Sequence, residues 1–102
     1  MVSSAMSRNR FSSIISNIHF ANNNNLEQGD QFGKVRPLLD HINAAYLANF
    51  QPKQVLGVDE SMVPYLGRHG AKQYIHGKPI KFGYKMWVLA TRLGYVVNFY
   101  PY

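Results

Sequence analysis

The sequence contains no cysteine, which excludes disulfide bonds and thiolate metal sites. Acidic residues are scarce: five Asp and Glu stand against eleven Lys and Arg, for a formal net charge of +6. No apolar run approaches the roughly 20 residues that a membrane-spanning helix needs. The first residues also lack the apolar core of a signal peptide. We therefore expect a soluble intracellular protein without a membrane partner.

Charged residues are few overall, at 16%, while aromatic residues make up 14% of the chain. This combination predicts apolar surface that further structure should cover. The basic excess is concentrated in residues 53–102, which carry a net formal charge of +5, compared with +1 for residues 1–52. A basic half favours polyanions such as DNA as partners. Charge alone does not distinguish a surface that binds DNA from an ordinary basic surface exposed to solvent.

The first helical pattern covers residues 7–20. Ser7 can cap the helix, and Phe11, Ile14 and Ile18 then recur on one face. If this face is exposed, it forms an apolar patch that suits assembly with another chain.

The second helical pattern covers residues 30–50, after the asparagine run at 22–25, which favours turns. Pro37 disfavours helical geometry at Arg36 but is acceptable as the first residue of a helix. We therefore predict a helical turn, a kink, and then a helix from Pro37 to about Asn49.

The period changes after residue 51. Residues 54–59 form a short apolar run that predicts a buried strand ending at Asp59. Residues 64–81 contain three glycines and two prolines and are predicted to be mostly loop. Residues 82–91 alternate as a strand does, with apolar residues on both faces of their distal half, so burial on both sides is expected. A tight turn at 92–94 and a last strand over 95–102 complete the pattern.

One acidic pair, Asp59 and Glu60, stands in the basic half. A carboxylate at a strand end can reach a metal ion, but two-metal phosphoryl transfer needs several carboxylates that converge on one point. The alternative is a structural acid that bonds loop amides or a nearby lysine. The loop over residues 67–81 mixes glycine with cations that can contact phosphates. It lacks the spacing of a Walker loop, and a solvated basic loop is its alternative.

Several segments, in order along nearly the whole chain, resemble the piggyBac transposase family. The matching segments are Met6–Phe11 with Ile18–Phe20, Lys34–Asp40, Val58–Pro64, Gly67–Arg68, Lys72–Ile75, Lys78–Lys81, Gly83–Lys85 and Trp87–Ala90. Each motif alone is weak, whereas the ordered set is specific.

This resemblance implies an α+β fold: N-terminal helices followed by the first three strands of an incomplete ribonuclease H-like sheet. It implies a helical DNA-binding or dimerisation segment over residues 1–52 and a truncated catalytic core over residues 53–102. Members of the family are nuclear DDE transposases that cut and rejoin DNA with three aspartates and a divalent metal, Mg²⁺ or Mn²⁺. Asp59 matches the first aspartate and would be a catalytic metal ligand, whereas Glu60 receives no catalytic role.

The resemblance also gives four cations a role in DNA-backbone binding: Arg68, Lys72, Lys78 and Lys81. The family's other two aspartates lie downstream of Tyr102, so we expect this chain alone to bind no metal and to be inactive. The alternative functions are a non-enzymatic DNA-binding module and a module that pairs with itself or with a full-length transposase.

Overall fold

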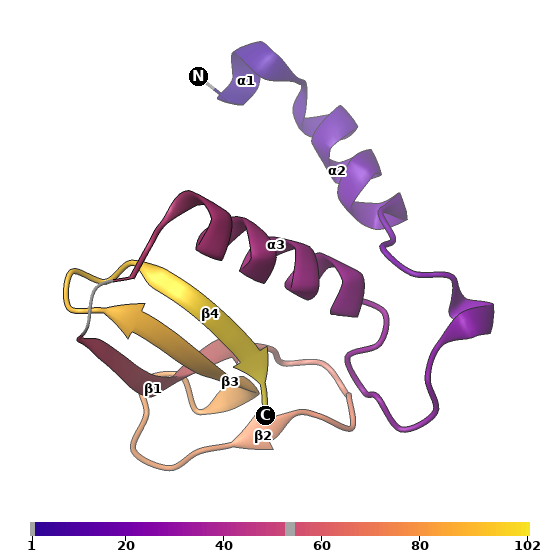
Figure 1. The fold of residues 1–102 in the computed structure, drawn as a ribbon. Helices are drawn as coiled ribbons and strands as arrows, with labels where there is room; N and C mark the ends of the chain where they lie inside the picture. Colours follow the sequence, from indigo (N-terminus) through magenta and orange to yellow (C-terminus); the bar gives the residue numbers. More distant parts are fainter. Residues whose placement is uncertain (1, 53–54) are drawn as a thin grey trace.

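The computed structural model describes residues 2–52 and 55–102 (Figure 1). Helices occupy the first half and an antiparallel sheet of four strands the second, which confirms the predicted α+β class and the order of its parts. Within the described residues no helix is both long and apolar enough to cross a bilayer.

Two helices begin the chain and stand apart from the sheet in Figure 1: α1 (Val2–Ala5) and α2 (Arg8–Asn17). Ser7 caps α2 as predicted, because its Oγ accepts the backbone N–H of Arg10 at 3.3 Å. The helix ends three residues earlier than predicted, since Ile18 is extended. No residue of α2 is buried.

The asparagine run lies between α2 and α3 and forms a turn-like segment as predicted, but α2 has already ended before it, at Asn17. The run forms the short 3₁₀-helix η1 (Asn23–Asn25), capped by the side chain of Asn22, which accepts the N–H of Asn24 at 3.0 Å. The next helix, α3 (Arg36–Asn49), begins one residue before Pro37, so the proline lies in its first turn, as predicted.

The sheet is built around β3 (Phe82–Thr91). β1 (Leu56–Pro64) pairs with β3 along one edge, while β2 (Gln73–Tyr74) and β4 (Val96–Pro101) pair with the other edge, all antiparallel. The predicted turn after β3 is confirmed: Gly94 has a φ of +86° and donates its N–H to the Thr91 carbonyl at 2.9 Å. Glycine suits this left-handed conformation because it has no Cβ.

α3 packs against β4 and covers one face of the sheet beside it (Figure 1). The ring of Tyr46 contacts the rings of Tyr95 and Phe99, and Met86 and Val97 are buried in the core. The opposite face is open: the side chain of Trp87 is 39% exposed. The prediction that β3 is buried on both sides is therefore wrong for the described residues, which place helical cover on one face alone.

Two predictions about the strands need correction. β1 begins at Leu56 and continues five residues past Asp59, and most of its residues are exposed rather than buried. Residue 54, the predicted start of this strand, lies outside the described residues. The sheet also has four strands rather than three, because Gln73 and Tyr74 pair with the start of β3 inside the predicted loop. The division at residues 52 and 53 stays a prediction, and residue 53 lies outside the described residues.

Candidate functional site

Asp59 lies in the middle of β1, opposite Val88 of β3, and its side chain is exposed. It was predicted at the end of a strand; the strand continues because residues 60–64 keep pairing with residues 83–87 of β3. One carboxylate oxygen, Oδ1, accepts the backbone N–H of Glu60 at 2.7 Å. The sheet therefore holds the backbone of Asp59 while its carboxylate faces solvent.

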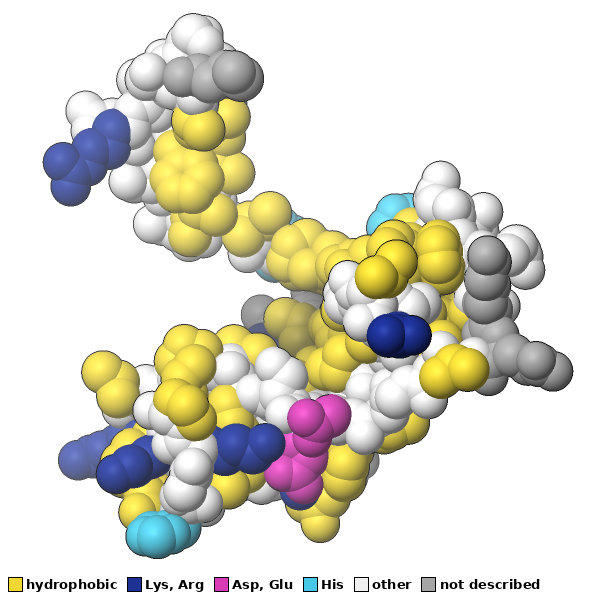
Figure 2. Space-filling view, turned by 90° about the vertical axis from the view of Figure 1, so that its left-hand side faces the viewer, with side chains coloured by type: hydrophobic (Ala, Val, Ile, Leu, Met, Phe, Trp, Pro, Cys, Tyr) yellow, Lys and Arg dark blue, Asp and Glu magenta, His cyan; other side chains and the backbone are white. Residues whose placement is uncertain are grey.

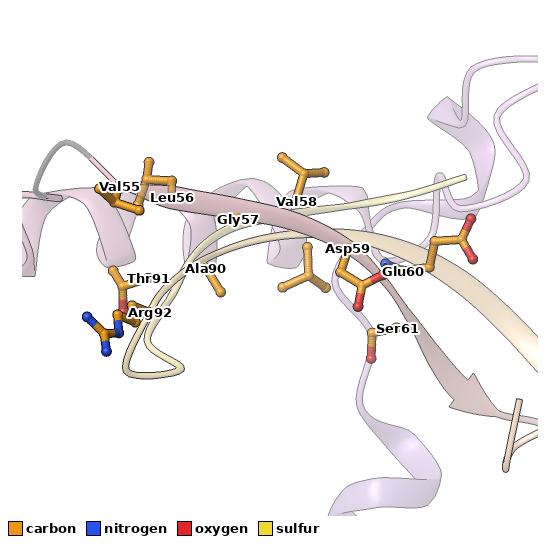
Figure 3. A pocket seen from close by; sticks show the side chains of 11 residues that line it. Val55, Leu56, Gly57, Val58, Asp59, Glu60, Ser61, Ala90, Thr91 and Arg92 are labelled. Carbon is orange, nitrogen blue, oxygen red and sulfur yellow. Dashed lines mark hydrogen bonds between the residues drawn. The ribbon is translucent and has the colours of Figure 1, made fainter.

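The carboxylate of Asp59 lies beside a shallow open groove of about 490 Å³ (Figure 3). Its apolar lining includes Val88 and Ala90, and its polar lining includes Asp59, Ser61 and Arg92. In Figure 3 the side chains of Asp59 and Ser61 point to one side of β1, and those of Val58 and Glu60 point to the other. An exposed carboxylate at the edge of an open groove is accessible to a large substrate.

Glu60 is engaged on the opposite side of the sheet. Its Oε1 forms an ion pair with the ammonium group of Lys85 at 2.8 Å. The Nζ of Lys85 also lies 4.8 Å from the ring centre of Trp87 and 4.1 Å from that of Tyr102. Glu60 therefore borders the groove, but its side chain leaves β1 on the side opposite Asp59 and is bonded within the fold.

The described residues do not form a complete metal site. Among them, no group of three or more His, Asp or Glu side chains is close enough to hold an ion. The acid next to Asp59 in the chain, Glu60, points to the other side of β1 and is paired with Lys85. Mg²⁺ prefers six oxygen ligands in octahedral geometry, so a single carboxylate does not fit it.

The four predicted DNA-binding cations belong to the loop that joins β1 to β3, at the end of the sheet where β3 begins. Figure 2 shows Lys and Arg side chains gathered in the lower part of the molecule, at the level of this loop in Figure 1. Arg68 and Lys81 are exposed, and Lys78 is half-buried. The loop thus presents separate positive charges rather than one bonded cluster.

Lys72 differs from the other three cations. Its Nζ donates to the carbonyls of Leu66 and Gly67 at 3.3 and 3.2 Å and lies 5.3 Å from the ring centre of Phe82. These contacts give Lys72 a structural role in the loop, which sequence reasoning missed because the partners are backbone carbonyls and a ring.

A second cavity, of about 560 Å³, lies between the start of α3 and the sheet, and sequence reasoning did not find it. The rings of Phe32, His69 and Tyr84 meet there, with centroids 5.3 to 6.4 Å apart. Burial raises the pKa of Tyr84 above its usual value, and the nearby Tyr65 raises it further. The rings around this cavity pack the loop against the segment before α3.

Asp30 supports the same region from the turn before α3. Its carboxylate accepts hydrogen bonds from Nε and Nη2 of Arg36 at 2.9 and 2.8 Å, and from the N–H of Phe32 at 3.0 Å. The hydrogen bond from Arg36, followed by that from Phe32, lowers the pKa of Asp30 below its usual value. This bidentate pair fixes the chain where it enters the helix.

Comparison with known proteins shows the family to which this chain belongs. The family model described as "Transposase IS4" matches residues 1–102. The chain therefore belongs to this transposase family, and the relatives below are its piggyBac-type members.

Two human relatives align with this chain. PiggyBac transposable element-derived protein 3 is 51% identical over 102 residues, and PiggyBac transposable element-derived protein 2 is 42% identical over 101 residues. A cryo-EM structure of the piggyBac transposase synaptic complex with hairpin DNA matches 98% of the chain with a TM-score of 0.83 and 30% identity. The predicted piggyBac resemblance is thus confirmed. The chain spans 17% of the length of each human relative and 22% of the chain in the solved structure.

Proposed function

We propose that this chain is the part of a piggyBac-type DNA transposase that supplies the first catalytic aspartate, Asp59. The observation that carries the proposal is the exposed carboxylate of Asp59, held on a sheet strand beside an open groove. A rigid strand places a reacting group more accurately than a loop does, which suits phosphoryl transfer. Membership of the transposase family and the likeness to the piggyBac complex support the same role.

The proposed chemistry needs ligands that the described residues lack. In the complete family enzyme, Mg²⁺ or Mn²⁺ would neutralise charge on the DNA phosphate that reacts. One carboxylate offers too few oxygen ligands for either ion, so the chain alone should hold no metal tightly. We therefore propose that it is catalytically inactive without two further aspartates and that it functions within a ribonuclease H-like core.

DNA is the proposed partner, and the nucleus is the compartment where a cut-and-paste transposase meets chromosomal DNA. The solved relative is a complex with hairpin DNA, which supports this assignment. The loop cations Arg68, Lys78 and Lys81 carry charges without hydrogen bonds to other described residues, so they are available to phosphates. Lys72 was expected to share this role, but its carbonyl contacts favour a part in holding the loop.

The proposal is tested with the purified chain and a supercoiled plasmid. We expect binding that weakens steeply as the salt concentration rises, because phosphate contacts release counterions. We expect no nicking with either Mg²⁺ or Mn²⁺. Metal-dependent nicking that disappears in Asp59→Ala would show that the chain carries a complete site, and failure to bind DNA at low salt would remove DNA as its partner.

The second candidate function is a non-enzymatic module that binds DNA or pairs with another transposase chain. The exposed face of α2 favours it: the side chains of Phe11, Ile15 and Ile18 are 51%, 56% and 50% exposed. Figure 2 shows hydrophobic side chains along this helix. Exposed apolar side chains on one helix face are typical of an interaction surface. We propose residues 1–52 as the dimerisation or DNA-binding segment and residues 53–102 as part of the catalytic core.

A further inference from the structure

A bonded cluster occupies the sheet face opposite Asp59. It consists of Glu60 on β1, Lys85 and Trp87 on β3, and Tyr102 after β4, and is called here the Lys85 cluster. The ammonium group of Lys85 pairs with Glu60 at 2.8 Å and lies against both aromatic rings. The side chains of Lys85 and Glu60 are only 14% and 28% exposed, so solvent screens this pair less than it screens a surface ion pair.

The backbone joins this cluster directly to Asp59. Just beyond β1, Tyr65 donates its N–H to the carbonyl of Phe82, so this residue faces β3. In an antiparallel pair, backbone groups that face the partner strand alternate with groups that face away. Tyr65 and the odd-numbered residues of β1 therefore face β3, and the even-numbered residues face away from it. The N–H of Glu60 therefore points away from β3, toward the edge of β1 that no other described strand covers. At 2.7 Å, the carboxylate of Asp59 accepts this N–H. The orientation of Asp59 thus depends on how the peptide group of Glu60 is held.

We propose that the Lys85 cluster is a clamp that positions Asp59. Lys85 holds the side chain of Glu60 on one face of the sheet, and the alternation of the strand then holds Asp59 on the other, beside its groove. The N–H of Glu60 occupies Oδ1 and leaves Oδ2 for a ligand. Lys85 and Glu60 are positioning residues and touch no substrate. The inference rests on the proposed role of Asp59.

The clamp also explains why the acidic pair is Asp-Glu, since the two side chains have different reaches. The short side chain of Asp59 meets its neighbour's N–H, while the longer side chain of Glu60 extends across to β3. Lys85 is further fixed through its own carbonyl, which accepts the N–H of Tyr102 at 3.0 Å. Unlike Lys81 of the loop, the Lys85 ammonium is enclosed and is not available to DNA phosphates.

The test uses NMR spectroscopy of the purified chain without metal or DNA. We compare the wild type with Lys85→Met, which keeps the aliphatic stem but removes the charge, and with Glu60→Gln, which keeps the shape. The readouts are the χ1 couplings of Asp59 and the hydrogen-exchange rate of the Glu60 amide. In both variants we expect the couplings to average over rotamers and the amide to exchange at least threefold faster. Lys81→Met is the matched control and should change neither readout.

A structural role alone would lower the unfolding temperature but leave Asp59 unchanged. The inference is therefore overturned if the couplings of Asp59 and the exchange of the Glu60 amide stay as in the wild type in a folded Glu60→Gln chain. Reversal of the pair, in Glu60→Lys with Lys85→Glu, should restore both readouts in part. Neither result depends on DNA, so failure of the clamp can be told apart from failure of the proposed function, which the plasmid experiment decides.

Discussion

At the scale of single residues, some charged side chains are bonded within the fold, and others remain available to bind a ligand. Glu60 and Lys72 are engaged within the fold, through an ion pair and through two carbonyls. One carboxylate oxygen of Asp59 accepts a backbone N–H, and the residue as a whole is exposed. Arg68 and Lys81 are exposed, and their charged side-chain groups make no hydrogen bond to the described residues. On the sheet and its loop, the exposed charged groups thus include the acid Asp59 and several bases, which suits the proposed meeting of a metal ion and DNA phosphates.

Asp30 gives a pH-dependent prediction. Its folded pKa is lowered by Arg36, so its contribution to stability is present above the unfolded pKa, near 3.8, and is lost as the pH falls through the folded value. Asp30→Asn should lower the free energy of unfolding at pH 7 by about 1 kcal/mol, as expected for a partly exposed bidentate pair.

Urea unfolding at pH 7 and at about pH 2.5 checks this prediction, because the lower value lies below the ordinary pKa of an aspartate. The difference between the wild type and Asp30→Asn should shrink at the lower pH, where protonation weakens the ion pair of the wild type. Asp59→Asn is the control, because this exposed acid forms no ion pair with a described residue and accepts only the backbone N–H of Glu60. A difference that stays constant across this pH range would show that the ion pair is not the cause.

At the scale of elements, one helix side chain protects an edge of the sheet. Asn43 of α3 is buried; its Nδ2 donates to the carbonyl of Phe99 at 2.8 Å, and its Oδ1 accepts the N–H of Phe99 at 3.0 Å. These are the outward-facing backbone groups of β4, so the amide takes the place of a neighbouring strand. The opposite edge, on β1, has no such cover among the described residues.

Asn43→Ala should therefore be costly, because it leaves two part-buried backbone groups of Phe99 without their partners. We expect a loss of about 2–3 kcal/mol in the free energy of unfolding, measured by urea denaturation. Asn49→Ala is the matched control on the same helix. The side chain of Asn49 bonds only the carbonyl of Ala45 on the exposed surface, and its loss should cost less than about 0.5 kcal/mol. Equal losses in the two variants would contradict the proposed edge protection.

The elements that sequence could predict are those set by local chemistry. Pro37 marks the start of a helix through its fixed φ, Ser7 marks a cap, and Gly94 marks a turn. The continuation of β1 past Asp59 was missed because Ser61 and Pro64 are not typical of strands; pairing with β3 overrides their local preference.

The candidate site, too, has a part that the sequence could predict and a part that it could not. Asp59 could be proposed because it follows an apolar run and matches a family motif. The partners of Glu60 and Asn43 could not, because they lie 25 and 56 residues away along the chain and come together only through the register of β3 and the packing of α3. Contacts between distant residues leave no periodic signal in the sequence.

At the scale of the whole molecule, the described chain consists of a sheet with one helix packed on it and a helical arm that stands apart (Figure 1). α3 packs against β4 and so connects the helical half to the sheet. α2, by contrast, has no buried residue. Exposed apolar side chains on both the arm and the open sheet face suit a piece of structure that further chain or partners cover.

The arm should associate with a second copy of the chain when no other partner is present. Sedimentation velocity over a range of concentrations should show a reversible dimer, and Ile15→Asp should shift the chain to a monomer because it places a charge on the apolar face of α2. Ser13→Asp, on the polar face, should leave the association unchanged. A wild-type chain that is monomeric at every concentration would contradict this prediction.

The central claim is that Asp59 acts as the catalytic aspartate of a piggyBac-type transposase, and a segment exchange tests it most directly. Residues 1–102 replace the matching segment of the piggyBac transposase, and excision of a marked transposon is measured together with DNA binding. We predict excision by this chimera and a loss of at least a thousandfold in Asp59→Asn, with DNA binding retained. Excision by Asp59→Asn at the level of the unmutated chimera, or a folded, DNA-binding chimera without excision, would contradict the claim.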